Sequence, residues 1–247
     1  MRVCDNGKGR LLGVLAVKPL RFLLTVLMLA FAARSAHAAR PFVTDDARIV
    51  DGGGCQIETY VKRQGKFSER EFWFLPACNP SGNFELTLGG INVHSALPGD
   101  SNAAILQGKT LLKPLQTNGA GFALTLGALR ARPFQSSTTL NPYINTLGSF
   151  SYLDDRLVLH TNLGAIDDRQ AKITRGTWGI GGEILLAAPR LYAIVESYGQ
   201  RGDKPTFHTG LRIWMVPGRV QVDATAGRQN SGPPERHFYS IGLRLLF

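Results

Sequence analysis

The last nine residues of the chain alternate between apolar and polar side chains. Apolar residues occupy every second position from Tyr239 to Phe247, and Ser240, Gly242 and Arg244 lie between them. This period-two pattern predicts a β-strand with one apolar face. Similar segments recur along the chain, without a helical period, and predict twelve strands at about 55–63, 68–76, 83–94, 103–113, 119–132, 142–152, 157–166, 172–185, 191–199, 206–215, 220–228 and 236–247.

The connections between these segments alternate in length. The set at 76–82, 114–118, 154–156, 188–190 and 217–219 is mostly short, whereas the connections between the other pairs of strands are longer. Short turns at one rim and longer loops at the other are typical of outer-membrane barrels, and most segments approach the ~9–11 residues of a tilted membrane-spanning strand. We therefore predict an all-β fold, an antiparallel up-and-down transmembrane β-barrel of about 12 strands.

The C-terminal residue supports this fold class. A strand that ends on an aromatic residue resembles the last strand of bacterial outer-membrane barrels, which the barrel assembly machinery reads. Tyr239 and Phe247 are therefore our candidates for the assembly signal. The alternative is a half-buried strand at the end of a soluble β-barrel or sandwich with a binding cavity, which would be released with the periplasmic extract.

The N-terminus has the pattern of a secretory signal. Basic residues precede an apolar stretch from Phe22 to Ala33, which is too short to span a bilayer, and Ala36-His37-Ala38 is a small-x-small cleavage site. We predict a cleaved signal peptide at 1–38, an N-terminal periplasmic segment at 39–54 and a barrel at 55–247. The expected location is the outer membrane of a Gram-negative bacterium, after Sec export.

The charge of the chain is concentrated in its first residues. The formal net charge is +10, but the predicted signal holds six basic residues and one acidic residue, which leaves about +5. Because no basic cluster is interleaved with aromatic residues, nucleic acid is not an expected partner. Outer-membrane lipid is the expected surroundings of the barrel.

Two cysteines remain after the predicted cleavage. An even pair in an oxidising compartment predicts a disulfide between Cys55 and Cys78. If the chain turns at residues 65–68, the two cysteines face each other and Tyr60 lies opposite Trp73, which is a favourable cross-strand pair. The alternatives are two free buried thiols or a shifted register.

Alternation also assigns the ionisable residues to one face of the strands. Charges toward lipid are costly, whereas a wet lumen accepts them. The lumen-lining candidates are Glu58, Glu71, Lys109, His160, Arg175, Glu183, Glu196, Arg212, Asp223 and Arg244. Among these, Glu183, Glu196 and Asp223 are placed to meet Arg212 and Arg244. Such pairs either brace the barrel, which we favour, or line a conduction path or ligand site.

The predicted mature N-terminus, residues 40–47, reads Arg-Pro-Phe-Val-Thr-Asp-Asp-Ala and precedes a glycine cluster and Gln56-Ile57-Glu58. This opening resembles the outer-membrane family named for the meta-pathway of phenol degradation, and segments 193–196, 220–223 and 239–247 fit the same resemblance. The resemblance implies a barrel that admits small hydrophobic or aromatic compounds. It does not include the cysteine pair.

The acidic motif within this opening allows two interpretations. Thr44, Asp45 and Asp46 favour a local turn or cap through hydrogen bonds to the backbone. Two adjacent carboxylates also suit Ca²⁺, but such an ion needs six or more oxygen ligands, so we predict no metal site. We expect residues 39–54 to fold into or under the periplasmic mouth.

Catalysis is the main competing function. An outer-membrane acyl hydrolase would require a His-x-Ser pair on a strand, and neither His160-Thr161-Asn162 nor His208-Thr209-Gly210 provides one. The histidines are scattered singly, so no cofactor is expected. We predict a channel or transporter for a small, hydrophobic or aromatic solute rather than an enzyme, with an occluded structural or binding barrel as a further alternative.

Overall fold

The computed structural model describes residues 42–65, 69–96, 99–229 and 237–247. The predicted signal peptide at 1–38 lies outside the described residues. The described chain forms twelve strands: β1 (Cys55–Gln64), β2 (Glu69–Cys78), β3 (Phe84–His94), β4 (Ser101–Lys113), β5 (Ala120–Arg132), β6 (Thr139–Tyr152), β7 (Leu157–Asp168), β8 (Ile173–Ala187), β9 (Leu191–Gln200), β10 (Thr206–Val216), β11 (Val220–Gln229) and β12 (His237–Leu246).

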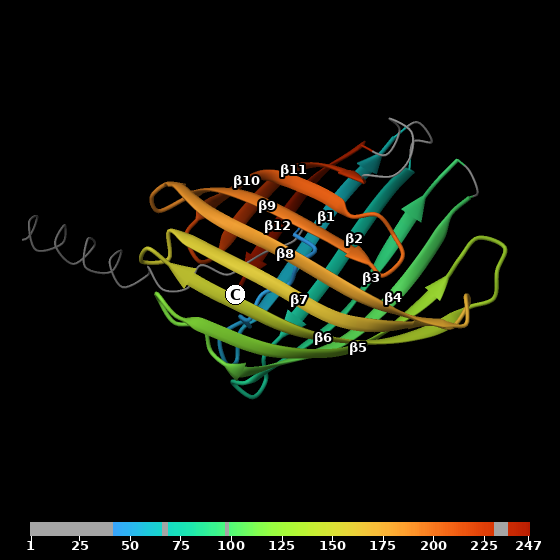
Figure 1. Cartoon of the computed structure of the whole chain (residues 1–247), viewed down its shortest axis with the longest axis horizontal. Coiled ribbons are helices and arrows are strands. Elements are labelled where there is room, and N and C mark those ends of the chain that lie inside the picture. Colours follow the sequence, from blue (N-terminus) through green and yellow to red (C-terminus); the bar gives the residue numbers. More distant parts are fainter. Residues whose placement is uncertain (1–41, 66–68, 97–98, 230–236) are drawn as a thin grey trace, which may run out of the picture. The chain divides into compact units, whose positions relative to one another are not determined.

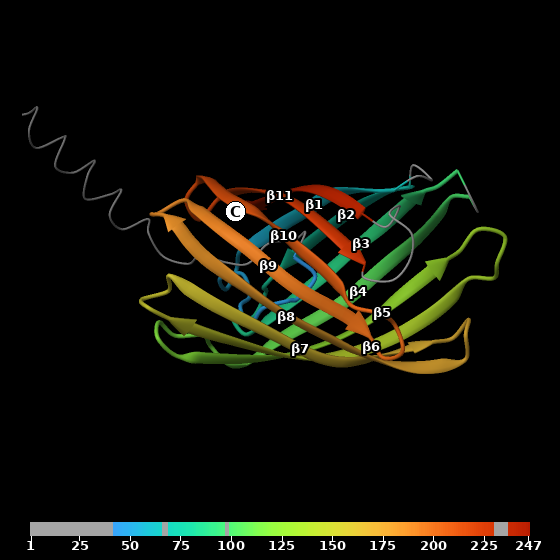
Figure 2. The same cartoon turned by 45° about the horizontal axis from the view of Figure 1, so that its top comes forward.

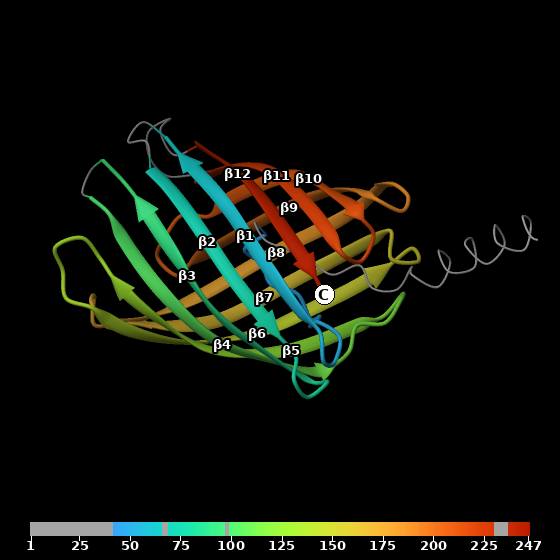
Figure 3. The same ribbon diagram turned by 180° about the vertical axis from the view of Figure 1, so that it is seen from behind.

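The strands form one closed antiparallel barrel in which each strand pairs with its neighbours in sequence (Figures 1 and 2). The barrel closes where β1 pairs with β12, which lie side by side in Figure 3, and Glu58 is opposite Arg244 in this pair. The predicted fold class and strand count are confirmed. The largest boundary difference is at β6, which begins at Thr139, three residues before the predicted start.

The two rims of the barrel differ in their connections. We call the rim that holds the start of β1 and the C-terminus the terminal rim, and the opposite one the distal rim. At the terminal rim, Leu153, Asp154 and Asp155 have φ angles of 56°, 56° and 63°, and this left-handed run lets β6 turn directly into β7. Compact turns at this rim bring successive strands into register.

The two faces of the barrel wall have opposite polarity. Outward side chains are apolar and exposed, as at Leu163 (67%), Ile241 (66%) and Leu88 (64%), whereas inward side chains such as Arg212 and His160 are buried. A soluble barrel has the reverse arrangement, so this wall fits a lipid environment. Among the described residues, no helix has the length and apolarity needed to cross a membrane.

The first hairpin has the predicted register. Cys55 lies opposite Cys78 and the two form a disulfide, and Tyr60 lies opposite Trp73 with their rings stacked at 5.1 Å between centroids. The disulfide therefore links β1 and β2 at the terminal rim, next to the point where Cys55 N–H donates to the carbonyl of Phe247 at 2.7 Å.

Candidate functional site

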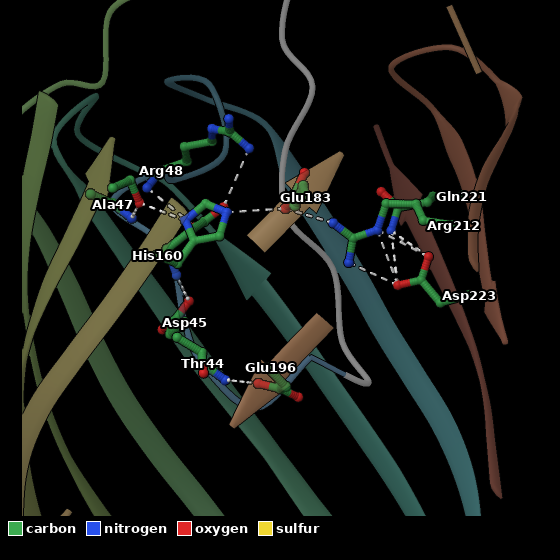
Figure 4. A network of polar contacts seen from close by, with 12 residues as sticks. Thr44, Asp45, Ala47, Arg48, His160, Glu183, Glu196, Arg212, Gln221 and Asp223 are labelled. Carbon is green, nitrogen blue, oxygen red and sulfur yellow. Dashed lines mark hydrogen bonds and ion pairs between the residues drawn. The ribbon is translucent and has the colours of Figure 1, made fainter. Parts of the chain in front are cut away.

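The segment before β1 lies inside the lumen. We call residues 42–54 the N-terminal plug, because their backbone and side chains bond to inward-facing residues of several strands (Figure 4). The sequence predicted a periplasmic segment at 39–54 that folds into or under the mouth. The barrel encloses residues 42–50, in which Thr44, Asp46 and Ala47 are almost completely buried, whereas Asp51, Gly52 and Gly53 are exposed just before β1.

Glu196 on β9 holds the start of the plug. Its carboxylate accepts hydrogen bonds from the backbone N–H of Val43 at 2.9 Å and of Thr44 at 2.8 Å. His208 on the neighbouring strand β10 donates from Nδ1 to the same carboxylate at 2.6 Å. Each bond to an ionised acceptor is stronger than a neutral one. Glu196 is thus a binding group for the backbone of the plug.

Asn162 on β7 binds the next residue of the plug. Its side-chain oxygen accepts from the N–H of Asp45 at 2.7 Å, and its Nδ2 donates to the carbonyl of Asp45 at 2.7 Å. The amide therefore satisfies both backbone groups of one residue, as a neighbouring strand would. Together with Glu196, it fixes three consecutive residues across the lumen.

Ser149, His160 and Glu183 form a buried chain of polar contacts beneath the plug. Ser149 Oγ accepts from the N–H of Ala47 at 2.8 Å and lies 2.8 Å from His160 Nδ1, and His160 Nε2 lies 3.2 Å from Glu183 Oε1. This series of a serine, a histidine and a carboxylate has the connectivity of the catalytic triad of a hydrolase. However, Ser149 and His160 are 0% exposed, so the plug covers the serine.

The motifs in the sequence did not reveal this chain of contacts. Ser149 and His160 lie on neighbouring strands and face each other in the pairing of β6 with β7. A search for His-x-Ser within one strand could not reveal it. A cross-strand register was predicted only for the first hairpin, and the same reasoning applied to β6 and β7 would have placed Ser149 opposite His160.

Lys109 on β4 binds the acidic motif of the plug. Its ammonium group contacts Asp45 at 2.9 Å and Asp46 at 3.2 Å. Burial alone would raise the pKa of the Asp46 carboxyl, but the charges of Lys109 and Arg48 hold this pKa below its usual range. The motif also forms a local turn, because the N–H of Arg48 donates to Asp46 at 3.2 Å. Glu85 on β3 accepts from the N–H of Val50 at 2.9 Å near the end of the plug.

Two glycines of β8 make room for the plug. A methyl group on Gly181 would lie 2.3 Å from a ring atom of Phe42, and one on Gly179 would lie 2.7 Å from the hydroxyl of Thr44. No such approach is sterically possible for a real side chain. Glycine at these two positions of β8 therefore leaves the space that Phe42 and Thr44 of the plug occupy.

A second cluster of buried charged residues lies beside the plug. Arg212 on β10 contacts Glu183 at 2.8 Å and Asp223 at 2.9 Å, and Gln221 donates to Asp223 at 3.0 Å (Figure 4). Arg212 thus meets Glu183 and Asp223, as the strand-face assignment allowed, and the bracing role of these pairs remains a prediction. Two predicted members lie elsewhere, because Glu196 binds the plug and Arg244 bonds to Gln56 and lies 3.5 Å from Glu58. Strand-face assignment could not distinguish neighbours at different heights of the lumen.

The other predicted residues lie apart from this cluster. Glu71 pairs with Lys62 at 2.7 Å, and Arg175 lies 3.9 Å from Asp168 toward the distal rim. Tyr239 and Phe247 are on the outside, 69% and 72% exposed, so their predicted role in assembly remains a prediction. Among the described residues, no group of three or more His, Cys, Asp or Glu side chains is arranged to hold a metal ion.

Between the plug and the distal rim, the lumen contains a cavity of about 480 Å³. Val43, Thr44 and Asp45 form one end of it, and Asp203, Lys204 and Gln229 lie at the other. Much of the wall is apolar or aromatic, with contributions from Trp73, Ile91, Ile105, Leu129, Tyr143, Ile166 and Tyr198. A much smaller space of about 40 Å³ lies on the other side of the plug, among charged residues.

Solved structures with the same architecture are outer-membrane proteins. The KdgM porin in complex with disordered oligogalacturonate has a TM-score of 0.56 at 12% identity, covering 78% of this chain and 99% of its own. The NanC porin has a TM-score of 0.56 at 9% identity, covering 76% and 98%. The COG4313 outer membrane channel from Pseudomonas putida F1 has a TM-score of 0.54 at 11% identity, covering 82% and 98%. At these identities the similarity shows a shared porin-like barrel fold.

Sequence comparison identifies the family. No curated protein matches the chain. A family model described as Uncharacterised conserved protein UCP029691 matches residues 25–247, which include the whole barrel and the N-terminal plug. That description does not mention phenol degradation, and the meta-pathway resemblance of residues 40–47 therefore does not define the family. The chain belongs to the family described as Uncharacterised conserved protein UCP029691.

Proposed function

We propose that the protein is an outer-membrane barrel that takes up a small hydrophobic or aromatic compound through its distal mouth. The observation that carries this proposal is the cavity of about 480 Å³ above the plug. This volume suits a small ligand, since such sites typically enclose about 300–1,000 Å³ and are mostly apolar. Uptake through the distal mouth requires that the distal rim faces the outside of the cell and the terminal rim faces the periplasm, as the short turns of outer-membrane barrels do.

The wall chemistry favours a neutral, apolar compound over a charged sugar. Val43 is 43% exposed although it projects from a segment inside the lumen, so the plug presents an apolar end to the cavity. Among the described residues that line the cavity, Lys204 is the one basic residue, and the acidic residues Asp45 and Asp203 also line it. Burying an anionic ligand here would therefore cost more than burying a neutral aromatic ring.

The polar groups near the plug provide a second level of selectivity. Gln107, Tyr143, Asn145, Asn162 and Thr177 all line the cavity. The hydroxyl of Tyr143 donates to Gln107 at 2.8 Å, and Thr177 donates to Asn145 at 3.1 Å. A few neutral polar groups on an apolar wall are suited to a ligand with a single hydroxyl, such as a phenol. The resemblance of residues 40–47 to the phenol meta-pathway family supports the same class of compound.

Fluorescence of Trp73 provides a direct test. The chain has three tryptophans, so Trp178→Phe with Trp214→Phe leaves Trp73 in the cavity wall as the sole reporter. We expect 4-bromophenol to quench it in the refolded protein at concentrations at which 4-bromobenzoate and galacturonate have no effect. Ile105→Asn should weaken the quenching, whereas Arg190→Gln, in an exposed turn at the terminal rim and outside the cavity wall, should leave it unchanged. Equal quenching by the neutral and anionic compounds would contradict the proposal.

A catalytic role is the second candidate, because Ser149, His160 and Glu183 are connected. It predicts deacylation of phospholipid by the purified protein and loss of that activity on Ser149→Ala. We favour uptake, since the serine accepts a hydrogen bond from the plug and is completely buried. Deacylation that is abolished by this substitution would reverse the order of the two candidates.

A further inference from the structure

Five arginines within the described strands lie on the outside of the barrel near its distal rim. We call Arg63, Arg70, Arg130, Arg132 and Arg228 the arginine belt, and all five are exposed. Strand alternation places them on the same outward face as the apolar residues of the wall. Val61, for example, precedes Arg63 by two residues and is 46% exposed. The belt therefore borders the apolar band at the level expected for lipid headgroups.

Strand pairing joins these residues across half of the barrel. Arg228 on β11 is opposite His237 on β12, and Arg63 on β1 is opposite Tyr239 of β12 and Arg70 of β2. Arg70 is in turn opposite His94 of β3, and Arg132 of β5 is opposite Asn102 of β4. Register thus places the belt on two groups of strands, β11 with β1 and β2 on one side and β5 on the other, with His94 of β3 and Asn102 of β4 between them.

The remaining strands lack this feature. Their outward residues nearest the distal rim are, within the described strands, not basic: Leu140, Asp167, Thr174, Gly199 and Phe207. Exposed basic residues occur there only in the connections, two positions beyond the ends of this outward row on β7, β8 and β9, as Arg169, Lys172 and Arg201. A general requirement for basic anchors at a membrane interface would distribute them around the whole rim. Within the described strands, the exposed arginines of this rim are instead found on β11, β1, β2 and β5, which indicates a binding surface on this side of the barrel wall.

The central pair of the belt is electrostatically unfavourable on its own. Arg63 and Arg70 occupy directly opposite positions on neighbouring strands, where like charges destabilise a sheet. Within the described part of the chain, none of the five arginines has an ion pair or side-chain hydrogen bond, whereas the neighbouring His94 contacts Asp100 at 2.7 Å. An anion between the guanidinium groups would convert this repulsion into attraction.

The residue type indicates which anion. All five members are arginine and none is lysine, and the planar guanidinium group binds phosphate through two parallel hydrogen bonds. We propose that the arginine belt binds the phosphate groups of a phosphorylated glycolipid of the lipid A type in the outer leaflet. This inference depends on the proposed outer-membrane location and is independent of the compound that enters the lumen.

Retention of glycolipid by the purified protein tests this inference. The refolded barrel is mixed with bisphosphorylated lipid A, with the same glycolipid after removal of both phosphates, or with inorganic phosphate. Bound lipid is then measured by native mass spectrometry, and protection against heat unfolding by gel mobility. The test variants are Arg63→Gln with Arg70→Gln, and independently Arg130→Gln with Arg132→Gln. Arg190→Gln with Arg219→Gln, in exposed turns at the terminal rim, is the control with the same change in charge.

We expect retention of bisphosphorylated lipid A to fall about tenfold or more in each test variant and to be unchanged in the control. A hydrogen bond to a charged group contributes about 1.5–3 kcal/mol, and a loss of about 1.4 kcal/mol lowers the affinity tenfold. Arg63→Lys with Arg70→Lys should restore only part of it. Equal retention by wild type and both test variants would overturn the proposal, as would equal retention of the dephosphorylated glycolipid. Equal protection by inorganic phosphate at the same concentration would assign the belt to free phosphate and overturn the lipid assignment.

Discussion

Replacing Glu196 should release the first residues of the N-terminal plug and so open the lumen. Glu196→Ala removes the acceptor for the N–H groups of Val43 and Thr44 and for His208. Hydrogen bonds to charged groups contribute about 1.5–3 kcal/mol each, so losing the two plug bonds costs about 3–6 kcal/mol before water enters the site. If water recovers about half of that, the ratio of closed to open plug falls about 10–100-fold.

The conservative substitution predicts a smaller effect. In Glu196→Gln, one oxygen remains to accept from the plug, and the amide group faces His208, whose ring can change tautomer to accept from it. The bonds to Val43 and Thr44 then become neutral rather than charged. We expect a loss of about 1 kcal/mol per bond and a correspondingly shorter opening. The fraction of time in which the plug is open should therefore be largest in Glu196→Ala, smaller in Glu196→Gln and smallest in the wild type.

Single-channel conductance in a planar bilayer measures this order. Asn162, Ser149, Lys109 and Glu85 still hold the plug from Asp45 to Val50, so the openings of Glu196→Ala should be transient rather than permanent. Glu71→Gln, which changes a lumen carboxylate that contacts Lys62 and not the plug, is the matched control and should behave as wild type. If Glu196→Ala and wild type conduct identically, the plug is not the closing element and the reasoning is refuted.

Three further perturbations test the packing of the barrel. Gly181→Ala places a methyl group 2.3 Å from Phe42 and should mimic plug release in the conductance assay, whereas Gly182→Ala, which faces outward, should not. Arg212→Met leaves two buried carboxylates without their cation and should lower unfolding stability in urea by about 3–5 kcal/mol, and an unchanged midpoint would show that the carboxylates find other partners. Cys55→Ala removes a disulfide between residues 23 positions apart and should lower the free energy of unfolding by about 3 kcal/mol. The temperature at which heating changes the gel mobility of the barrel should fall to that of the reduced wild type.

The barrel could be predicted from sequence because its physics is local and periodic. Lipid outside and polar groups inside impose an alternation on every strand, so the faces, the strand count and the Cys55–Cys78 register all follow from short-range patterns. The connection from one strand to the next is short, which makes neighbours in sequence neighbours in the sheet. Thus the fold and the inward position of residues such as Arg212 were accessible without coordinates.

The tertiary structure alone determined which inward residues meet. Glu196 and Val43 are separated by 153 positions, and Asn162 and Asp45 by 117, so no periodicity relates them. Their contact depends on the tilt of the strands and on the height at which the plug enters the closed lumen, and both are properties of the complete barrel. The contact of Ser149 with Ala47 of the plug and the apolar cavity above Val43 arise for the same reason. Sequence therefore determined the wall of this protein, whereas the plug and the cavity required the closed three-dimensional structure.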